Sequence, residues 1–557
     1  MNESERLLMF RLCFKYLRRN GPFYLYFLVS LCSSIVALAI PLVIGMMVNQ
    51  LIELDADLQD VLRLCLILFA LGAVRGLLVF AANCLYVNVQ AHAGYRLNAD
   101  VLEHMQKLPQ SYFESFDAAY VNQQINHDAN NLLIFAISSS VQIASNAISL
   151  IAIVSILLAQ NPMLAVVCIV LACSNGILYV QFRHKLFSKT YSMREQQSRF
   201  FSSLQAQLSD IEFIRRHALF RQYRMRLEES FGEFYPAVRD AQIINYQFEL
   251  GNSIISAVVQ AALFAVGAFE VISGALLAGY LISAMSYYES LSSSVQFFLT
   301  WGKTLQDNRV CYERLRRILD VEVENNGEKK KTSISSIELK NVSCSWQEGL
   351  PLLQDVSLRF EKGKLYGIAG ANGCGKSTLL DVLLGMGPGN LRGIVRYDGT
   401  DLREVDKYYL RENGVGIAEQ SPKLVPGSML SNLLLCAPNR DLSSLDTYLD
   451  IFDLRDVVGG AFDEVSRSAG QQCVLSGGEK QKIAIVRLLL QSPEVMLFDE
   501  PTSALDAKSR SELISLLEQK KNQHVIIAVS HDERLLDACD VVFSMNDGKI
   551  IARSKWT

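Results

Sequence analysis

Long apolar stretches separated by polar ones dominate the first half of the chain. A helix needs roughly 20 mostly apolar residues to cross the hydrocarbon core of a membrane. Six stretches reach this length with few or no charged residues, at about 23–48, 61–89, 132–158, 162–182, 250–269 and 271–292. The pattern therefore predicts a membrane domain over residues 1–321 with six transmembrane helices.

The polar stretches between these spans are also predicted to be helical. Residues 90–130 and 183–245 are amphipathic and nearly free of glycine and proline, which favours helices that continue beyond the bilayer. Basic residues gather before the first span and in the stretch 215–226, whereas the loop 53–60 is acidic. Because cytoplasmic loops are rich in Lys and Arg, we expect both termini and the long polar stretches in the cytoplasm.

The pattern changes after the first 321 residues. A polar, solvated linker over residues 322–334 is followed by alternating strand-like and helix-like segments over 335–557. Such alternation is typical of an α/β domain. No internal repeat of the whole unit is present, so the chain has one membrane domain and one α/β domain.

Composition excludes some classes of protein. Half of the 557 residues are hydrophobic and the formal net charge is -4, so no broad basic field indicates nucleic-acid binding. The 12 cysteines are scattered without a C-x-x-C pair. This indicates a reduced, cytosol-facing protein without a disulfide framework or a zinc site.

A glycine-rich motif is the first candidate binding site in the α/β domain. Residues 370–378 match the phosphate-binding loop G-x-x-x-x-G-K-[ST], after a hydrophobic strand at 365–369 and before a helix at 377–384. Backbone N–H groups of such a loop surround phosphates, the lysine adds a charge and the hydroxyl binds Mg²⁺. The predicted ATP contacts are Gly370, Asn372, Gly373, Gly375, Lys376, Ser377 and Thr378.

An acidic pair follows a second hydrophobic strand. Asp499 and Glu500 come directly after residues 495–498 and before Pro501. We expect Asp499 to hold Mg²⁺ through water and Glu500 to orient and deprotonate the attacking water.

Five motifs in one order resemble the ATPase of ATP-binding cassette (ABC) proteins. They are the phosphate loop, Leu475-Ser-Gly-Gly-Glu479, Asp499-Glu500, Ser503-Ala-Leu-Asp506 and His531. The resemblance implies an α-helical membrane domain with long cytoplasmic extensions, followed by an α/β P-loop ABC ATPase domain that uses ATP and Mg²⁺.

The resemblance also assigns roles to single residues. Gln420 matches the glutamine that senses Mg²⁺, Trp346 matches an aromatic residue that stacks on adenine, and His531 matches the residue that contacts the γ-phosphate. The signature residues Ser476, Gly477 and Gly478 are expected to cap the nucleotide of a second ATPase domain. Ser503 and Asp506 belong to the loop at that dimer contact, so the partner is a second copy or a related half-transporter.

The membrane half resembles six-helix exporters. Residues 112–128 and 208–215 are similar to the intracellular loops that press on the ATPase domains. The chain departs from the usual pattern at Ala119 and Asn126, where exporters carry glycine and arginine. It also departs at residues 465–470, where an acidic-glycine pattern is usual.

Polar residues within the spans are candidates for a substrate path, because such groups face a cavity or another helix. The candidates are Arg75, Gln142, Asn146, Tyr287 and Glu289. For the serines in the third and sixth spans, contacts between helices are as good an explanation as a substrate path. A structural ion pair of Arg75 with Glu249 or Glu289 is the alternative to a functional role.

These features predict an ATP hydrolase that exports a peptide or amphiphilic compound by alternating access. The alternatives are a lipid or drug exporter, a metal-chelate importer of the same fold, and an ATP-gated regulator that transports nothing. The presence of Glu500 and His531 argues against the last. About twenty residues precede the first span, which leaves no room there for a leader peptidase. The expected location is a bacterial inner membrane, with membrane lipid and the cargo as further partners.

Overall fold

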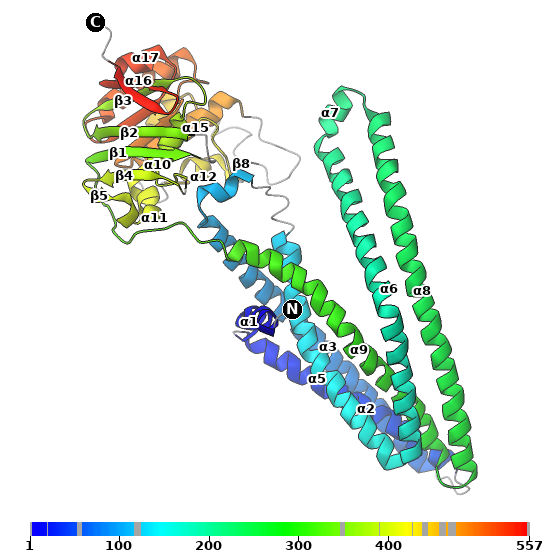
Figure 1. The fold of residues 1–557 in the computed structure, drawn as a ribbon. Coiled ribbons are helices and arrows are strands. Elements are labelled where there is room, and N and C mark those ends of the chain that lie inside the picture. Colours follow the sequence, from blue (N-terminus) through cyan, green and yellow to red (C-terminus); the bar gives the residue numbers. More distant parts are fainter. Residues whose placement is uncertain are drawn as a thin grey trace. The chain divides into compact units, whose positions relative to one another are not determined.

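The computed structural model describes residues 3–18, 20–52, 58–115, 124–345, 351–388, 390–425, 427–436, 444–455, 464–465 and 475–553. Two compact units make up the chain (Figure 1). The first comprises residues 1–103 and 118–320, and the second comprises residues 104–117 and 321–557. The segment 104–117 groups with the second unit, whereas the sequence-based division includes it in the membrane domain. The predicted boundaries of the membrane domain, linker and ATPase domain otherwise stay a prediction.

The first unit is helical in its described residues (Figure 1). Its elements are α1 (Glu3–Arg18), α2 (Gly21–Ile52), α3 (Leu58–Gln106), a π-helical turn η2 (Gln124–Asp128), α5 (Ala129–Gln160), α6 (Pro162–Ser209), α7 (Ile211–Arg216), α8 (Phe220–Ile272) and α9 (Ala278–Leu319). Within the described residues, four helical stretches are long and apolar enough to cross a membrane: 21–52, 58–106, 125–160 and 220–272. That all six predicted stretches span the membrane stays a prediction.

The helices of the first unit pack through a shared apolar cluster. It joins Ile153 and Leu157 of α5, Leu164 of α6, Leu263 of α8 and Tyr287 of α9. Helices α2 and α9 also approach closely, since a Cβ on Gly279 would lie 1.9 Å from the carbonyl oxygen of Gly45. Small residues permit such contacts between membrane helices. The predicted spans on α6 and α9 therefore pack with the others.

The connection between α8 and α9 differs from the expectation. The sequence places the turn at Glu270, but α8 continues to Ile272 and α9 begins at Ala278. The backbone turns at Gly274, whose φ of +76° suits glycine. Glu270 lies in the last turn of α8, and its carboxylate accepts a hydrogen bond from Asn161 Nδ2 at 3.1 Å. Asn161 is itself the N-cap of α6 and accepts from Met163 N and Leu164 N.

In its described residues, the second unit contains three sheets. The largest has the order β12-β11-β3-β10-β9-β6 and is parallel except for β12 at its edge. Its strands are β3 (Leu365–Gly370), β6 (Val415–Ala418), β9 (Val495–Asp499), β10 (Val525–Val529), β11 (Val541–Asn546) and β12 (Lys549–Arg553). An antiparallel sheet has the order β2-β1-β4-β5, from β1 (Ser336–Ser345), β2 (Pro351–Glu361), β4 (Arg392–Tyr397) and β5 (Thr400–Asp401). A short pair joins β7 (Gly427–Ser428) and β8 (Glu464–Val465).

Helices and short turns connect these strands. They are η1 (Gln110–Ser115), α10 (Lys376–Leu383), η3 (Leu402–Glu404), α11 (Lys407–Tyr409), η4 (Leu410–Gly414), α12 (Met429–Leu433), α13 (Leu445–Ile451), α15 (Gly477–Gln491), α16 (Ala507–Lys520) and α17 (Glu533–Ala538).

The parallel strands are buried on both faces, as their continuous runs of hydrophobic residues indicate. Alternate residues enter different apolar clusters: Leu497 packs in the cluster with α10, and Phe498 packs in the cluster with α15, α16 and α17. Such burial on both sides fixes the register of the central strands. The structure confirms the predicted helical membrane domain followed by an α/β domain.

Candidate nucleotide site

The carboxyl ends of four neighbouring parallel strands meet at one edge of the large sheet. Strands β3, β10, β9 and β6 lie side by side in that order. The segments that leave them carry the phosphate loop, His531, Glu500 and Gln420, respectively. Ligands of open α/β sheets bind at this edge. The topology thus explains how motifs far apart in the sequence come together.

The phosphate loop joins β3 to α10 in a conformation that requires glycine. Gly373 and Gly375 have φ values of +79° and +105°, and a Cβ on Gly375 would lie 2.4 Å from the carbonyl oxygen of Leu352. Lys376 is only 7% exposed, and its Nζ donates to the carbonyls of Gly370 at 2.7 Å and Ala371 at 2.9 Å. The ammonium group therefore lies against the loop, beside the N-terminus of α10, where phosphate oxygens are favoured.

Oxygen ligands suited to Mg²⁺ lie next to the loop. Ser377 Oγ donates to Asp499 Oδ2 at 3.1 Å. Burial raises the pKa of Asp499, although the Ser377 hydrogen bond opposes this. Burial, together with the charges of Asp499 and Glu419, raises the pKa of Asp381 to about 6. The Ser377 hydroxyl and the Asp499 carboxylate are adjacent oxygen ligands of the kind that Mg²⁺ takes, so this pair fits Mg²⁺.

The metal would not be held by protein carboxylates alone. Among the described residues, no group of three His, Cys, Asp or Glu side chains could hold a metal ion. Mg²⁺ is usually bound by one or two protein groups plus phosphate oxygens and water. Gln420 follows β6 at the same sheet edge, and its side chain is exposed.

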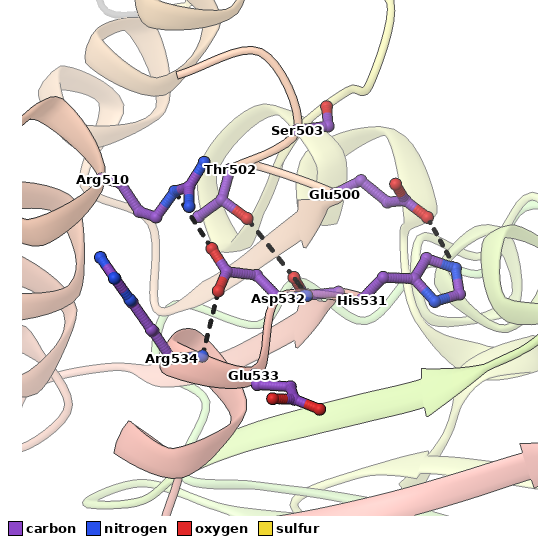
Figure 2. A pocket seen from close by; sticks show the side chains of 9 residues that line it. Glu500, Thr502, Ser503, Arg510, His531, Asp532, Glu533 and Arg534 are labelled. Carbon is purple, nitrogen blue, oxygen red and sulfur yellow. Dashed lines mark hydrogen bonds and ion pairs between the residues drawn. The ribbon is translucent and has the colours of Figure 1, made fainter. Parts of the chain in front are cut away.

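Glu500 and His531 face each other across this edge (Figure 2). Glu500 Oε1 lies 3.2 Å from His531 Nε2. The same imidazole nitrogen lies 3.2 Å from Lys376 Nζ and 3.1 Å from Asn372 Oδ1. His531 therefore connects the phosphate loop to Glu500, whose carboxylate can accept a proton from water.

The backbone at Glu500 adopts an uncommon conformation. Its φ of +48° lies in the left-handed region, which costs a residue with a side chain about 1 kcal/mol or more. Two hydrogen bonds hold it there: Glu500 N donates to Val529 O at 2.9 Å, and Gln481 Nε2 donates to Glu500 O at 2.7 Å. The direction of the Glu500 side chain therefore depends on β10 and α15.

Gln481 is a site residue that the sequence analysis missed. It is 1% exposed, its Nε2 also lies 3.2 Å from Ser503 Oγ, and its Oε1 accepts from Ala504 N at 2.9 Å. One amide thus joins helix α15 to the loop that follows Glu500. A buried glutamine among the apolar residues of α15 was the available signal, since buried polar groups are normally hydrogen-bonded.

A second network holds the backbone around His531 (Figure 2). Asp532 N donates to Ser530 Oγ at 3.0 Å, and Asp532 Oδ1 accepts from Arg534 N at 3.0 Å as the N-cap of α17. Arg510 Nε of α16 lies 3.2 Å from Asp532 Oδ2. These residues line a cavity of about 430 Å³ that also includes Glu500, Ser503 and His531.

We predict that Gln481→Leu lowers both stability and ATP turnover. The change leaves the Glu500 carbonyl and the Ala504 N–H without their partner, and because both hydrogen bonds are partly buried we expect a loss of about 1 kcal/mol or more. The melting temperature and kcat of purified protein measure the two effects. Gln491→Leu is the matched control, because Gln491 is also buried on α15 but bonds Glu412 O instead. The control should lose stability and keep kcat, and equal kcat values for the two variants would contradict the assigned role of Gln481.

The signature motif begins helix α15. Ser476 is its N-cap: Ser476 Oγ accepts from Glu479 N at 3.2 Å, and Glu479 Oε2 accepts from Ser476 N at 2.6 Å. Gly477 and Gly478 form the first turn. Among the described residues, no hydrogen bond joins Ser476 to the phosphate loop of its own chain.

Asp506 and Ser503 have roles within the chain itself. Asp506 caps α16 by accepting from Ser509 N at 2.8 Å and pairs with Lys482 Nζ at 2.8 Å. The Lys482 ammonium lowers the pKa of Asp506. Trp346, Ala119 and residues 466–470 lie outside the described residues.

The candidate path residues fall into two groups. Arg75, Asn146 and Tyr287 line one cavity of about 220 Å³ in the first unit, whereas Gln142 and Glu289 are not among its lining residues. The Tyr287 hydroxyl donates to Leu38 O at 2.6 Å. Among the described residues, neither Glu249 nor Glu289 forms an ion pair with Arg75, so the structure does not support the alternative of a structural pairing with either residue.

Comparisons with known proteins agree with this site. The family described as "ABC transporter transmembrane region" matches residues 23–295, and the family "ABC transporter" matches residues 353–503. The microcin-J25 export ATP-binding/permease protein McjD of Escherichia coli is 23% identical, over 99% of this chain and 96% of its own. The ATP-dependent lipid A-core flippase of Photorhabdus laumondii is 25% identical, over 89% of this chain and 86% of its own.

A solved structure has the same fold. It is that of a bacterial Atm1-family ABC exporter with ATP bound, which is 19% identical, with a TM-score of 0.81 over 96% of this chain and 95% of the other. The motifs, the two family matches and this fold agree over both units. The chain belongs to the ABC transporters, as a membrane protein that combines a transmembrane region and an ATPase in one chain and couples ATP hydrolysis to transport.

Proposed function

We propose that this protein is an ATP-driven exporter that works by alternating access as a dimer with two shared ATP sites. The observation that carries this proposal is the convergence of Lys376, Asp499, Glu500 and His531 at one sheet edge, while Ser476, at the start of α15, makes no hydrogen bond to the phosphate loop among the described residues. An ATP site built this way needs a second signature helix. A second copy of this chain supplies one.

The residues at the sheet edge have different roles in ATP hydrolysis. The phosphate loop and Lys376 bind the phosphates, and Ser377, Asp499 and Gln420 hold Mg²⁺. When bound, Mg²⁺ supplies positive charge that stabilises the phosphate oxygens. Glu500 accepts the proton of the attacking water, and His531 contacts the γ-phosphate. Trp346 stacks on adenine.

The two copies complete each other's sites. Ser476, Gly477 and Gly478 of one copy face the γ-phosphate bound by the other, because the N-terminus of a helix favours an anion. Ser503 and Asp506 lie at the same contact. ATP binding closes the dimer, and hydrolysis reopens it.

The cargo we propose is a peptide or an amphiphilic compound. Relatives of nearly full length are named for the export of microcin J25 and for flipping the lipid A core, and both names describe movement of compounds by export-type proteins. The polar cavity in the membrane unit supports a cargo with polar groups. The basic residues before the first span support a cytoplasmic N-terminus, and we place the protein in the bacterial inner membrane.

ATPase activity in lipid nanodiscs tests the proposal. Pools of peptides, lipids, drugs and metal chelates are added in turn, with Glu500→Gln as the inactive blank. Stimulation by peptides or amphiphiles supports the proposal. Stimulation by metal chelates alone would contradict the proposed cargo class, and a flat basal rate with every pool would favour the non-transporting regulator.

A further inference from the structure

The small cavity of the membrane unit has one charged residue in its wall. Helices α2, α3, α5 and α9 line it, and its volume is about 220 Å³. Six serines, Asn146 and the buried Tyr287 provide polar groups, and Arg75 alone carries a charge among the described lining residues. The cavity is therefore hydrated and positive.

Arg75 has no counter-ion among the residues that the structure describes. It lies at the middle of the predicted span 61–89, within α3. Among the described residues, no Asp or Glu oxygen lies within 4.0 Å of its guanidinium group. A charge at this depth is costly and usually pairs with another group. Since no carboxylate of the described residues pairs with Arg75, its guanidinium group is available to a ligand in the cavity.

The neighbouring polar groups leave the guanidinium available. Ser34 Oγ donates to Ser30 O at 3.0 Å, Ser293 Oγ donates to Ser290 O at 2.9 Å, and Asn146 Nδ2 donates to Gln142 O at 2.8 Å. These bonds run along the residues' own helices. Arg75 thus keeps its planar fork of N–H donors, which matches carboxylate and phosphate oxygens in pairs.

The size of the cavity limits what enters it. Pockets that enclose a whole drug-sized ligand have volumes of roughly 300–1,000 Å³, and this cavity is smaller. It suits the polar end of a longer molecule, whose apolar part lies outside the cavity.

We propose that this cavity binds the anionic group of an amphiphile, a carboxylate or a phosphate, through Arg75. The proposal rests on the proposed transport function and makes it more specific, since it names the chemical class of the cargo: an anionic amphiphile. A cargo compound and a bilayer lipid carry the same chemistry, so the experiment has a separate arm for each.

The test is equilibrium binding to the full chain in phosphatidylcholine nanodiscs without ATP. The probes are N-dodecanoylglycine, which ends in a carboxylate, and N-dodecanoylglycinamide, which is neutral and nearly identical in shape. We expect the carboxylate to bind at least about tenfold more tightly, a preference of about 1.4 kcal/mol. Arg75→Gln should bring the ratio close to one, and Arg75→Lys should retain part of it because the charge remains without the fork.

The matched control is Arg63→Gln. Arg63 also lies on α3, but it pairs with Asp60 at 2.8 Å and does not line the cavity. It should keep the full preference. Equal affinity of the wild-type protein for both probes, or an unchanged ratio in Arg75→Gln, would overturn the proposal. If Arg75→Gln has a lower melting temperature than the wild-type protein, the ratio of the two affinities is compared between Arg75→Lys and the wild-type protein instead. An unchanged ratio in Arg75→Lys would then overturn the proposal.

A lipid arm separates the two sources of the anion. Replacing a third of the phosphatidylcholine by phosphatidylglycerol should leave N-dodecanoylglycine bound if the site serves cargo. Competition by phosphatidylglycerol that depends on Arg75 supports the anion site and identifies bilayer lipid as its occupant. Because binding is measured without ATP, a failure of the proposed transport function would appear as absent ATP-driven transport while this preference remains.

Discussion

Glu500→Gln is expected to lower ATP turnover by about 10²- to 10⁴-fold, the usual contribution of a general base, while ATP stays bound. An amide has the shape of the carboxylate but cannot accept the proton of the attacking water at neutral pH. The backbone bonds that hold residue 500, to Val529 O and from Gln481 Nε2, do not involve its side chain. The variant should therefore fold normally, and the measurement is kcat together with the dissociation constant for ATP.

The same cavity provides the control for this prediction. Glu533 lines it beside His531, but no ion pair joins Glu533 to that imidazole among the described residues. Glu533→Gln should keep kcat within about twofold, as surface substitutions away from a specific contact usually do. Normal turnover in Glu500→Gln would show that another group activates the water.

Replacement of Ser476 is expected to have the second large effect, and two variants separate its two roles. Ser476→Ala removes the cap of α15, which costs about 1 kcal/mol of stability, and in the proposed dimer it removes a donor that faces the partner's nucleotide. Ser476→Asp keeps a side-chain oxygen that accepts from Glu479 N, but it loses the hydroxyl's donation to Glu479 Oε2 at 2.9 Å. In the proposed dimer it also places a negative charge toward the γ-phosphate. Both should lower kcat by about 10²-fold or more, as the loss of one well-placed donor does.

Stability and turnover together decide this prediction. Ser476→Asp should lose far more turnover than stability, whereas a purely structural role of Ser476 would affect stability more than turnover. Ser428→Asp is the matched control, since Ser428 caps α12 by accepting from Ser431 N at 3.0 Å. Normal turnover in Ser476→Asp would contradict ATP sites shared between two copies.

The nucleotide site was largely predictable from the sequence because its motifs directly follow hydrophobic strands. Buried parallel strands have continuous apolar runs, and their carboxyl ends share one edge of the sheet. Asp499 and His531 therefore had to lie near the phosphate loop. Gln481 could not be located this way, because its partners are 19 to 23 residues away and depend on how α15 packs against the loop.

The membrane residues show a different limit. Residues of a helix advance about 100° each, so Glu289 lies about 200° around α9 from Tyr287 and cannot line the same cavity. Ser290 and Ser294, three and seven residues after Tyr287, share its face and do line it. The sequence contained this information, but which face of α9 meets α2 and α5 depends on packing such as the close approach of Gly45 and Gly279.

The most direct test of ATP-driven export uses inside-out membrane vesicles. Vesicles that contain the wild-type protein or Glu500→Gln are given a cell extract of peptides and amphiphiles, with and without ATP, and the retained compounds are identified by mass spectrometry. The account predicts a compound that accumulates only with ATP and only in wild-type vesicles, because their interior corresponds to the outside of the cell. ATP-dependent accumulation in right-side-out vesicles loaded with ATP instead, or no difference between the wild-type protein and Glu500→Gln, would contradict it.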